Sequence, residues 1–194
     1  MQRAGYHVHD GFYLRIAAGL GAGHLNVSTD SHQANDFAVG GAGLGLNLWL
    51  GGTPWRGVAL GGLMMLQGIN DSSTRVAGHS THETMNGSVL LLGPFIDAFP
   101  DPMRGLHVGG SLALAGFNAK AQGDNLELVH QVKDYNSGGL GASAWVGYMG
   151  FVGPEWSLGG LLQVTALATS KTEDDIKRNA SGYALTLSFT ALYH

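Results

Sequence analysis

The sequence FYLRIAAGLGAG, residues 12–23, decides the fold, because large apolar and smaller residues alternate along most of its length. One set of alternate positions holds Phe12, Leu14, Ile16, Ala18, Leu20 and Ala22; the other holds Tyr13, Arg15, Ala17, Gly19, Gly21 and Gly23. A period of two places these sets on opposite faces of a β-strand. A helix is disfavoured here, because each glycine would cost it about 1 kcal/mol relative to alanine.

The same alternation recurs seven times. Residues 41–50, GAGLGLNLWL, place Ala42 and four leucines on one face and Asn47, Trp49 and glycines on the other. The other predicted apolar faces are Val58, Leu60, Met64 and Leu66; Val89, Leu91, Phe95 and Phe99; Leu106, Val108, Leu112 and Leu114; Leu140, Ala142, Ala144 and Val146; Trp156, Leu158, Leu162, Val164 and Ala166; and Leu185, Leu187, Phe189, Ala191 and Tyr193. Eight strands in one domain over residues 1–194 are therefore predicted, with residues 1–10 as an N-terminal extension.

The predicted links between strands alternate in length. Short links at 51–57, 98–105 and 150–155 each contain proline. Long links at 26–36, 68–86, 118–138 and 169–180 are rich in polar residues. Three tight turns and four long loops are typical of an antiparallel up-and-down meander with both termini on the tight-turn side.

Charge decides which face meets water. Charged residues make up only 12% of the chain, about half the usual share. The eight predicted strand segments contain just Arg15 and Asp97 of the 24 charged residues, whereas a water-soluble barrel would carry charges on its outer strand positions. We therefore predict an all-β fold, an eight-stranded antiparallel transmembrane β-barrel with its apolar face toward lipid, which pairs every backbone group without an edge. A soluble sandwich with the aromatic residues in its core is the alternative.

Several other classes of protein are excluded. The net charge of −4 and pI near 6.1 argue against a nucleic-acid partner. The chain has no cysteine, which removes disulfides and thiolate metal sites, and no apolar run long enough for a membrane-spanning helix. The first residues lack the apolar segment of a secretory signal, so we expect a mature or trimmed form with an added Met1.

Aromatic residues gather near the predicted strand ends, as Trp and Tyr do at membrane interfaces. The predicted girdle on the tight-turn side is Trp49, Trp55, Phe95, Phe99, Tyr148, Phe151, Trp156 and Tyr193. The predicted girdle on the opposite side is Phe37, Phe117, Tyr135 and Tyr183.

With this topology the chain resembles small bacterial outer-membrane barrels: the transmembrane domain of OmpA and the OmpX, OmpW and opacity-type proteins. The last strand, residues 183–193, is similar to their C-terminal assembly signal, except that His194 follows the aromatic Tyr193. The resemblance implies an outer-membrane location with periplasmic termini and turns. It also implies outer-membrane lipid, lipopolysaccharide and the barrel assembly machinery as partners, and a monomer. A peptidoglycan-anchoring role like that of full-length OmpA is not expected, because residues 1–194 are taken up by the predicted barrel and its N-terminal extension.

Polar residues predicted to face the lumen are Arg15, Asn47, Asp97, His107 and Gln163. An unpaired charge would be costly there, so Arg15 and Asp97 are predicted to pair; alternatively each is hydrated or bonded to neighbours such as Tyr13 and Asn47. An apolar lumen wall is predicted from Leu63, Met65, Leu90, Leu92 and Ile96, with Pro94 beside them. It could border a hollow for a small apolar molecule, unless Tyr13, Trp49 and Trp145 fill the space.

Neither a catalytic nor a metal site is predicted. The histidine pair His79 and His82, and the group His7, His9 and Asp10, each lack a third ligand held on a rigid element. The His-x-Ser motif of a lipid A deacylase is missing; the nearest matches are His79 with Ser80 and His24 with Ser28. No cofactor is expected. The predicted function is a non-enzymatic barrel with a structural or surface-interaction role; the alternatives are a conduit for small hydrophobic molecules and a lipid-modifying enzyme.

Overall fold

The protein forms a closed antiparallel β-barrel in a computed structural model that describes residues 11–29, 36–76, 79–80, 84–122, 134–173 and 176–193. The strands are β1 (Gly11–Thr29), β2 (Phe37–Trp55), β3 (Val58–Val76), β4 (His79–Ser80), β5 (Thr84–Ala98), β6 (Leu106–Gln122), β7 (Asp134–Phe151), β8 (Trp156–Glu173) and β9 (Ile176–Tyr193). Eight of them are long, and β4 is a two-residue strand beside β3. No helix in the described ranges is both long and apolar enough to cross a membrane.

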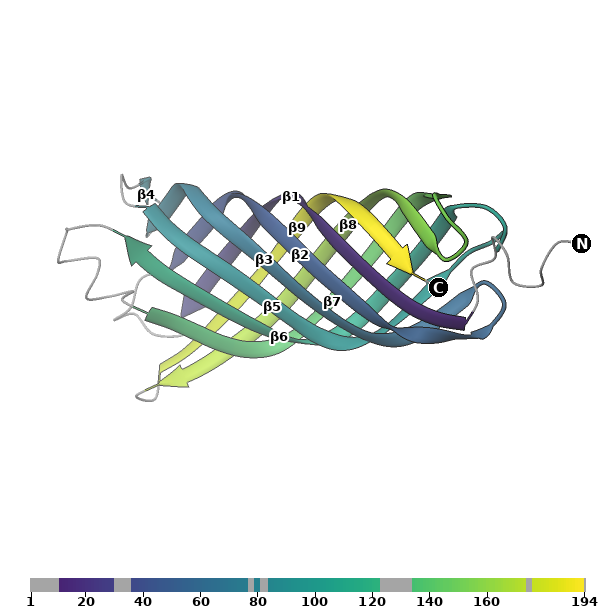
Figure 1. Cartoon of the computed structure of the whole chain (residues 1–194). Helices are drawn as coiled ribbons and strands as arrows, with labels where there is room; N and C mark the ends of the chain where they lie inside the picture. Colours follow the sequence, from purple (N-terminus) through teal and green to yellow (C-terminus); the bar gives the residue numbers. More distant parts are fainter. Residues whose placement is uncertain are drawn as a thin grey trace, which may run out of the picture.

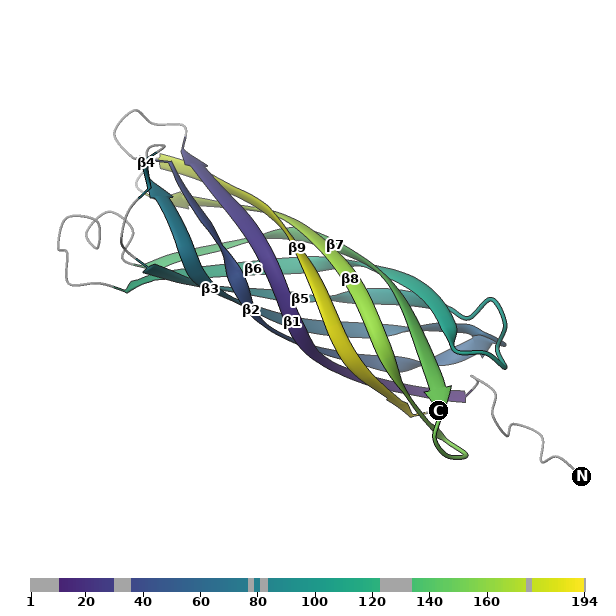
Figure 2. The same ribbon diagram turned by 90° about the horizontal axis from the view of Figure 1, so that it is seen from above.

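The eight long strands follow one another around the barrel, and β1 closes it by pairing with β9 (Figures 1 and 2). The closing pair runs in continuous register from Leu14 opposite Tyr193 to Thr29 opposite Arg178. Closure leaves no long strand with an unpaired edge. The predicted eight-stranded up-and-down barrel is confirmed.

Three tight turns lie at one end of the barrel, where β1 begins and β9 ends (Figure 1). The turn between β2 and β3 uses Gly57 at a positive φ of 76°, which glycine adopts without strain. The amide of Phe99 donates to the carbonyl of Gly57 over 2.7 Å, so this turn is tied to the link between β5 and β6. We call this end the tight-turn end and the other the long-loop end.

The strands run further toward the long-loop end than the sequence pattern predicts. Between β8 and β9 the predicted loop 169–180 reduces to residues 174–175, because both strands continue through its polar residues. The predicted loops 26–36, 68–86 and 118–138 are shortened in the same way. A backbone ladder needs only its hydrogen bonds and not an apolar side chain, so polar strand ends are stable wherever their outer face meets water.

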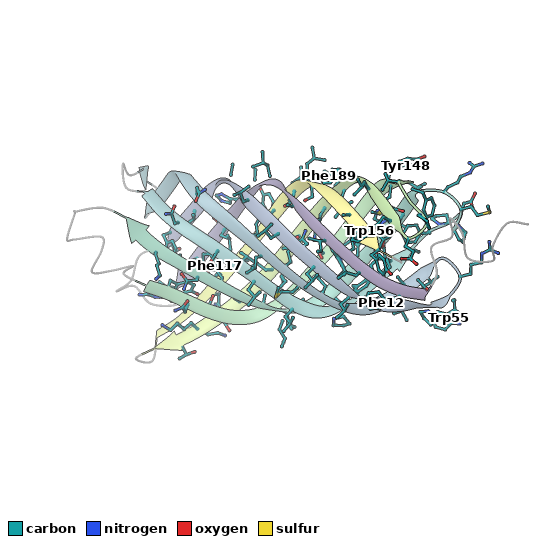
Figure 3. All side chains as sticks on the ribbon, in the orientation of Figure 1. Phe12, Trp55, Phe117, Tyr148, Trp156 and Phe189 are labelled. Atoms are coloured by element: carbon teal, nitrogen blue, oxygen red, sulfur yellow. The ribbon has the colours of Figure 1, made fainter. Side chains whose placement is uncertain are left out.

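The predicted faces are confirmed on seven of the eight long strands. Outward apolar side chains such as Leu20, Leu112 and Leu187 are exposed, while their sequence neighbours point inward. Figure 3 shows the labelled Phe189 and Tyr148 on the outside of the barrel. An outer face made of exposed apolar side chains is typical of a barrel that contacts acyl chains.

The prediction for β5 is wrong, because its two faces are interchanged. Leu90, Leu92 and Ile96 are 42%, 55% and 51% exposed on the outside and do not form a lumen wall. Val89, Leu91, Phe95 and Phe99, predicted to face outward, are buried inside. Both faces of β5 are apolar, so alternation alone does not orient this strand. The charge of Asp97 does, since it shares its parity with Phe95 and is buried in the lumen.

The two aromatic girdles also need correction. On the tight-turn side Trp55, Tyr148 and Trp156 are exposed (Figure 3), and Tyr193 packs against Trp156 with ring centroids 5.2 Å apart. Trp49, Phe95 and Phe99 lie inside the barrel instead. At the long-loop end Tyr183 is exposed, whereas Phe37, Phe117 and Tyr135 are buried inside. Position along a strand sets the depth of a residue, but its parity decides between lipid and lumen.

The outer face of the barrel changes from apolar to polar along the axis. On β1 the outward residues change from Ile16 and Leu20 to the polar Asn26, while the inward residues change from Arg15 to the apolar Leu25. The outward apolar stretch on β9, residues 183–193, spans about 25 Å along the axis at a typical rise and tilt. This apolar outer band matches a bacterial outer membrane in height, and the strands continue beyond it toward the long loops.

Candidate functional site

The most densely bonded part of the lumen is a polar cluster around the carboxylate of Asp97 on β5. The Tyr13 hydroxyl donates to Oδ2 over 2.6 Å, Nη1 of Arg15 donates to Oδ2 over 2.8 Å, and the indole of Trp145 donates to Oδ1 over 2.9 Å. Nδ1 of His107 lies 3.1 Å from both carboxylate oxygens. β1, β5, β6 and β7 thus meet at one side chain, and we call these five residues the Asp97 cluster.

Arg15 has no exposed surface, and neither has Asp97. The guanidinium carbon of Arg15 lies 3.8 Å from the ring centre of Trp49 and 5.2 Å from that of Trp145. Stacking on aromatic faces offsets part of the cost of removing the cation from water. Nδ1 of His107 is 3.1 Å from Nη1 of Arg15; it accepts from Arg15 when unprotonated and donates to Asp97 when it carries hydrogen.

Two glycines make room for the cluster. A Cβ on Gly109 would lie 2.5 Å from the indole of Trp145 and 2.6 Å from Oδ1 of Asp97. A Cβ on Gly147 would lie 2.2 Å from Nε2 of His107. These glycines therefore serve packing inside the lumen and not merely strand curvature.

A second polar layer lies above the Asp97 cluster. Asn47 donates to Oε1 of Gln163 over 2.9 Å, and the amide of Gln163 contacts the Met65 sulfur at 3.2 Å. The hydroxyls of Ser111 and Ser143 are 2.7 Å apart. Ser111 and Ser143 face each other on the paired strands β6 and β7. The contacts of Gln163 on β8 with Asn47 on β2 and Met65 on β3 join strands that are not neighbours, so they hold opposite walls of the barrel together.

Three aromatic rings pack against one another inside the lumen toward its long-loop end. Tyr135 lies between Phe37 and Phe117, with ring centroids 5.9 Å and 5.8 Å away. All three are buried. We call them the aromatic plug, because they occupy the lumen where the barrel rises above the apolar outer band.

The described part of the lumen contains a small cavity toward the long-loop end. It lies next to Leu25, Ile69 and Leu167 and measures about 10 Å³, which is the scale of one water molecule. The side chains predicted to fill the lumen, Tyr13, Trp49 and Trp145, are all buried there.

The structure brings together only some of the residues predicted for the lumen. Arg15 and Asp97 form an ion pair with His107 in contact, while Asn47 and Gln163 bond to each other in the second layer. Leu63 and Met65 face the lumen. The sequence pattern does not predict the stacking of Phe99 on His107, whose ring centroids lie 5.2 Å apart. Phe99 shares its parity with Asp97, and that shared parity could have placed Phe99 in the lumen.

The histidine groups considered for a metal fall outside the described side chains, namely His7, His9 and Asp10 and the pair His79 and His82. Within the described residues no three His, Asp or Glu side chains are grouped as metal ligands. His24 and Ser28 lie on the outer face of β1, where His24 contacts Asn26 at 3.1 Å.

Comparison with known proteins supports the fold. No family model and no curated protein sequence matches the chain. Among solved structures, it is similar to the outer membrane protein OprG from Pseudomonas aeruginosa, with a TM-score of 0.54 and 10% identity over 97% of this chain and 99% of that one. It is also similar to the outer membrane protease OmpT from Escherichia coli, with a TM-score of 0.51 and 8% identity over 95% and 97% of the two chains. At these identities the likeness shows the antiparallel barrel fold alone.

Proposed function

We propose that this protein is a non-enzymatic barrel of a bacterial outer membrane, whose filled lumen makes it a rigid membrane-spanning support for loops that contact the outside. The observation that carries the proposal is the lumen itself. The Asp97 cluster, the Asn47 to Gln163 layer and the aromatic plug succeed one another along the axis. A conduit would need a continuous hollow instead.

The outer surface supports the membrane part of the proposal. The apolar outer band carries exposed leucines such as Leu44, Leu112 and Leu187, which would be unfavourable in water over so large an area. Trp55, Tyr148 and Trp156 border it at the tight-turn end, as interfacial aromatics do. In this proposal the tight-turn end and both termini are periplasmic, and the long loops are outside.

The alternative function, a conduit for small hydrophobic molecules, depended on an apolar lumen wall. Leu90 and Leu92, which were to line an apolar hollow, face outward. The lumenal cavity of about 10 Å³ is too small for such a ligand. Lipid modification has no supporting observation among the described side chains, and detection of acyl release from lipid A would reverse that judgement.

Conductance and orientation test the proposal. We expect the refolded protein to migrate differently on SDS gels with and without boiling, and to give no conductance steps in planar bilayers. Because the chain has no cysteine, single cysteines report orientation cleanly. On intact cells an impermeant maleimide should label Lys177→Cys, on the long-loop side, and not Met103→Cys in a tight turn. Steady conductance would refute the filled-support role, and the reverse labelling would refute the orientation.

A further inference from the structure

We propose that the link between β5 and β6, residues 99–105, is an acid-sensitive cap on the tight-turn end of the lumen. When His107 becomes charged, the cap loosens and water reaches the Asp97 cluster. The inference goes beyond the proposed support role and does not depend on it. Opening at this end makes no pore, because the layer of Asn47 and Gln163 and the aromatic plug lie further along the axis.

His107 lies where its Nδ1 can serve a cation or an anion but not both. Nδ1 is 3.1 Å from Nη1 of Arg15 and 3.1 Å from both carboxylate oxygens of Asp97. Without hydrogen on Nδ1 the ring accepts from Arg15. With hydrogen there the ring donates to Asp97, and its contact with Arg15 joins two donors. Nε2 is buried without a hydrogen-bond partner, so neither neutral form of the ring satisfies both nitrogens.

The charged form of His107 places a second cation beside one carboxylate. Within the described residues the ionisable groups around it are Arg15 and Tyr13 on β1 and Asp97 on β5, while β7 contributes the indole of Trp145. Asp97 is the one buried carboxylate in that part of the chain, and it already pairs with Arg15 over 2.8 Å. A second buried cation without a partner of its own is strongly unfavourable. Histidine gains this charge between about pH 8 and pH 5.

The packing of the Asp97 cluster does not require a histidine. The carboxylate already accepts from Tyr13 and Arg15 at Oδ2 and from Trp145 at Oδ1. The ring also demands a glycine at position 147, where a Cβ would lie 2.2 Å from Nε2. Ionisable groups within a membrane-spanning segment are costly and commonly functional. What His107 adds to the cluster is therefore a group that changes charge near neutral pH.

Phe99 covers the ring of His107 at the tight-turn end. The two rings stack with centroids 5.2 Å apart and planes inclined by 20°. His107 is the second residue of β6 and Phe99 directly follows β5, so the stacked pair lies beside the cap. Phe99 is only 3% exposed. A movement of His107 out of the cluster toward water at this end therefore displaces Phe99.

Backbone hydrogen bonds anchor the cap at its two ends. The amide of Phe99 donates to the carbonyl of Gly57 over 2.7 Å, and the carbonyl of Gly105 accepts from the amide of Met149 over 2.9 Å. The ring and the amide of Phe99 belong to one residue, so displacing the ring strains the bond to Gly57. Charging His107 is thus coupled to release of the cap from the turn between β2 and β3.

Quenching of the lumenal tryptophans tests the inference. Trp55 and Trp156 are exposed on the outside, so replacing both by phenylalanine leaves Trp49 and Trp145 as reporters. The protein is placed in phosphatidylcholine nanodiscs, which leave both ends accessible, and is quenched by the neutral solute succinimide. We expect the quenching constant to rise about threefold from about pH 7.5 to about pH 5.5. A constant that does not change with pH would overturn the proposal. Loss of the folded gel band at the lower pH would do the same, because the opening is local.

Variants identify the histidine responsible among the nine in the chain. His107→Gln cannot become charged, so it should abolish the pH dependence and keep quenching low. His24→Gln, on the outer face of β1, should respond as the parent does. A chain that keeps His107 and has glutamine at the other histidines leaves the cluster intact, and so tests the proposal where His107→Gln fails to fold. A response that persists in His107→Gln, or that is lost when His107 alone remains, would contradict the proposal.

Amide exchange locates the opening. The amide of Val152 donates to the carbonyl of Trp156 over 2.9 Å in the turn between β7 and β8, at the same end of the barrel but outside the cap. The ratio of exchange at Phe99 to exchange at Val152 cancels the intrinsic effect of pH on exchange. We expect this ratio to rise about threefold at about pH 5.5 in the wild type and to stay constant in His107→Gln. A wild-type ratio that does not rise would refute an opening at residues 99–105.

Discussion

Replacing Asp97 by leucine should be the most destabilising single change in the lumen. The carboxylate accepts from Arg15, Tyr13 and Trp145. Stranding the buried Arg15 cation costs about 3 to 5 kcal/mol. The orphaned Tyr13 hydroxyl and Trp145 indole add about 1 kcal/mol each at the low end of such penalties. We therefore expect Asp97→Leu to lower the free energy of unfolding by about 5 to 7 kcal/mol.

The measurement is equilibrium unfolding by urea in lipid vesicles, followed by tryptophan fluorescence and gel mobility. The matched control is the double variant Arg15→Met with Asp97→Leu, which removes both charges together. Only the Tyr13 and Trp145 donors then stay orphaned, so a loss of about 2 kcal/mol is expected. A loss below about 2 kcal/mol in Asp97→Leu, or a double variant as unstable as the sum of the single ones, would refute the pairing argument.

Three further outcomes follow from side-chain placement. Gly109→Val should destabilise the barrel by about 1 to 3 kcal/mol through overpacking against Trp145. The control Gly62→Val, whose side chain would point into open space, should destabilise it much less. Equal losses of stability in the two variants would contradict the packing role of Gly109. Leu187→Arg on the lipid face should cost about 2 to 4 kcal/mol in vesicle unfolding, and a neutral effect would exclude lipid at that depth. In single-tryptophan variants brominated lipid should quench Trp156 and spare Trp145; quenching of both would contradict the inward placement.

The strand pattern predicts most of this fold because a period of two is insensitive to sequence detail. It fails at β5, where Leu90 and Leu91 are equally apolar and alternation carries no direction. The single charge at Asp97 orients the strand, since burying a carboxylate in lipid without a partner is far less favourable than pairing it in the lumen. The pattern also ends the strands too early, because polar residues such as Asn26 favour a loop although the backbone ladder continues through them.

The pairing of Arg15 with Asp97 could be predicted because they were the only charges in the predicted spans, and charge balance left few other partners. The remaining members of the cluster could not be assigned their roles in this way. Tyr13 and Trp145 stand 84 and 48 residues from Asp97 along the chain. Their convergence depends on strand tilt and register around the whole barrel, which no local pattern encodes.

The change in polarity of the outer face along the axis alters what stabilises the side chains inside the lumen. Within the apolar outer band the exterior faces acyl chains, so association between side chains across the lumen must come from hydrogen bonds and close packing, as with Arg15 and Asp97. Above that band the exterior is polar and meets water, so apolar side chains such as Phe117 gain from burial in the ordinary way. One barrel thus uses membrane-protein packing at the tight-turn end and soluble-barrel packing at the long-loop end. Polar substitutions in the aromatic plug should therefore weaken the outer part of the barrel while leaving its membrane-spanning part folded.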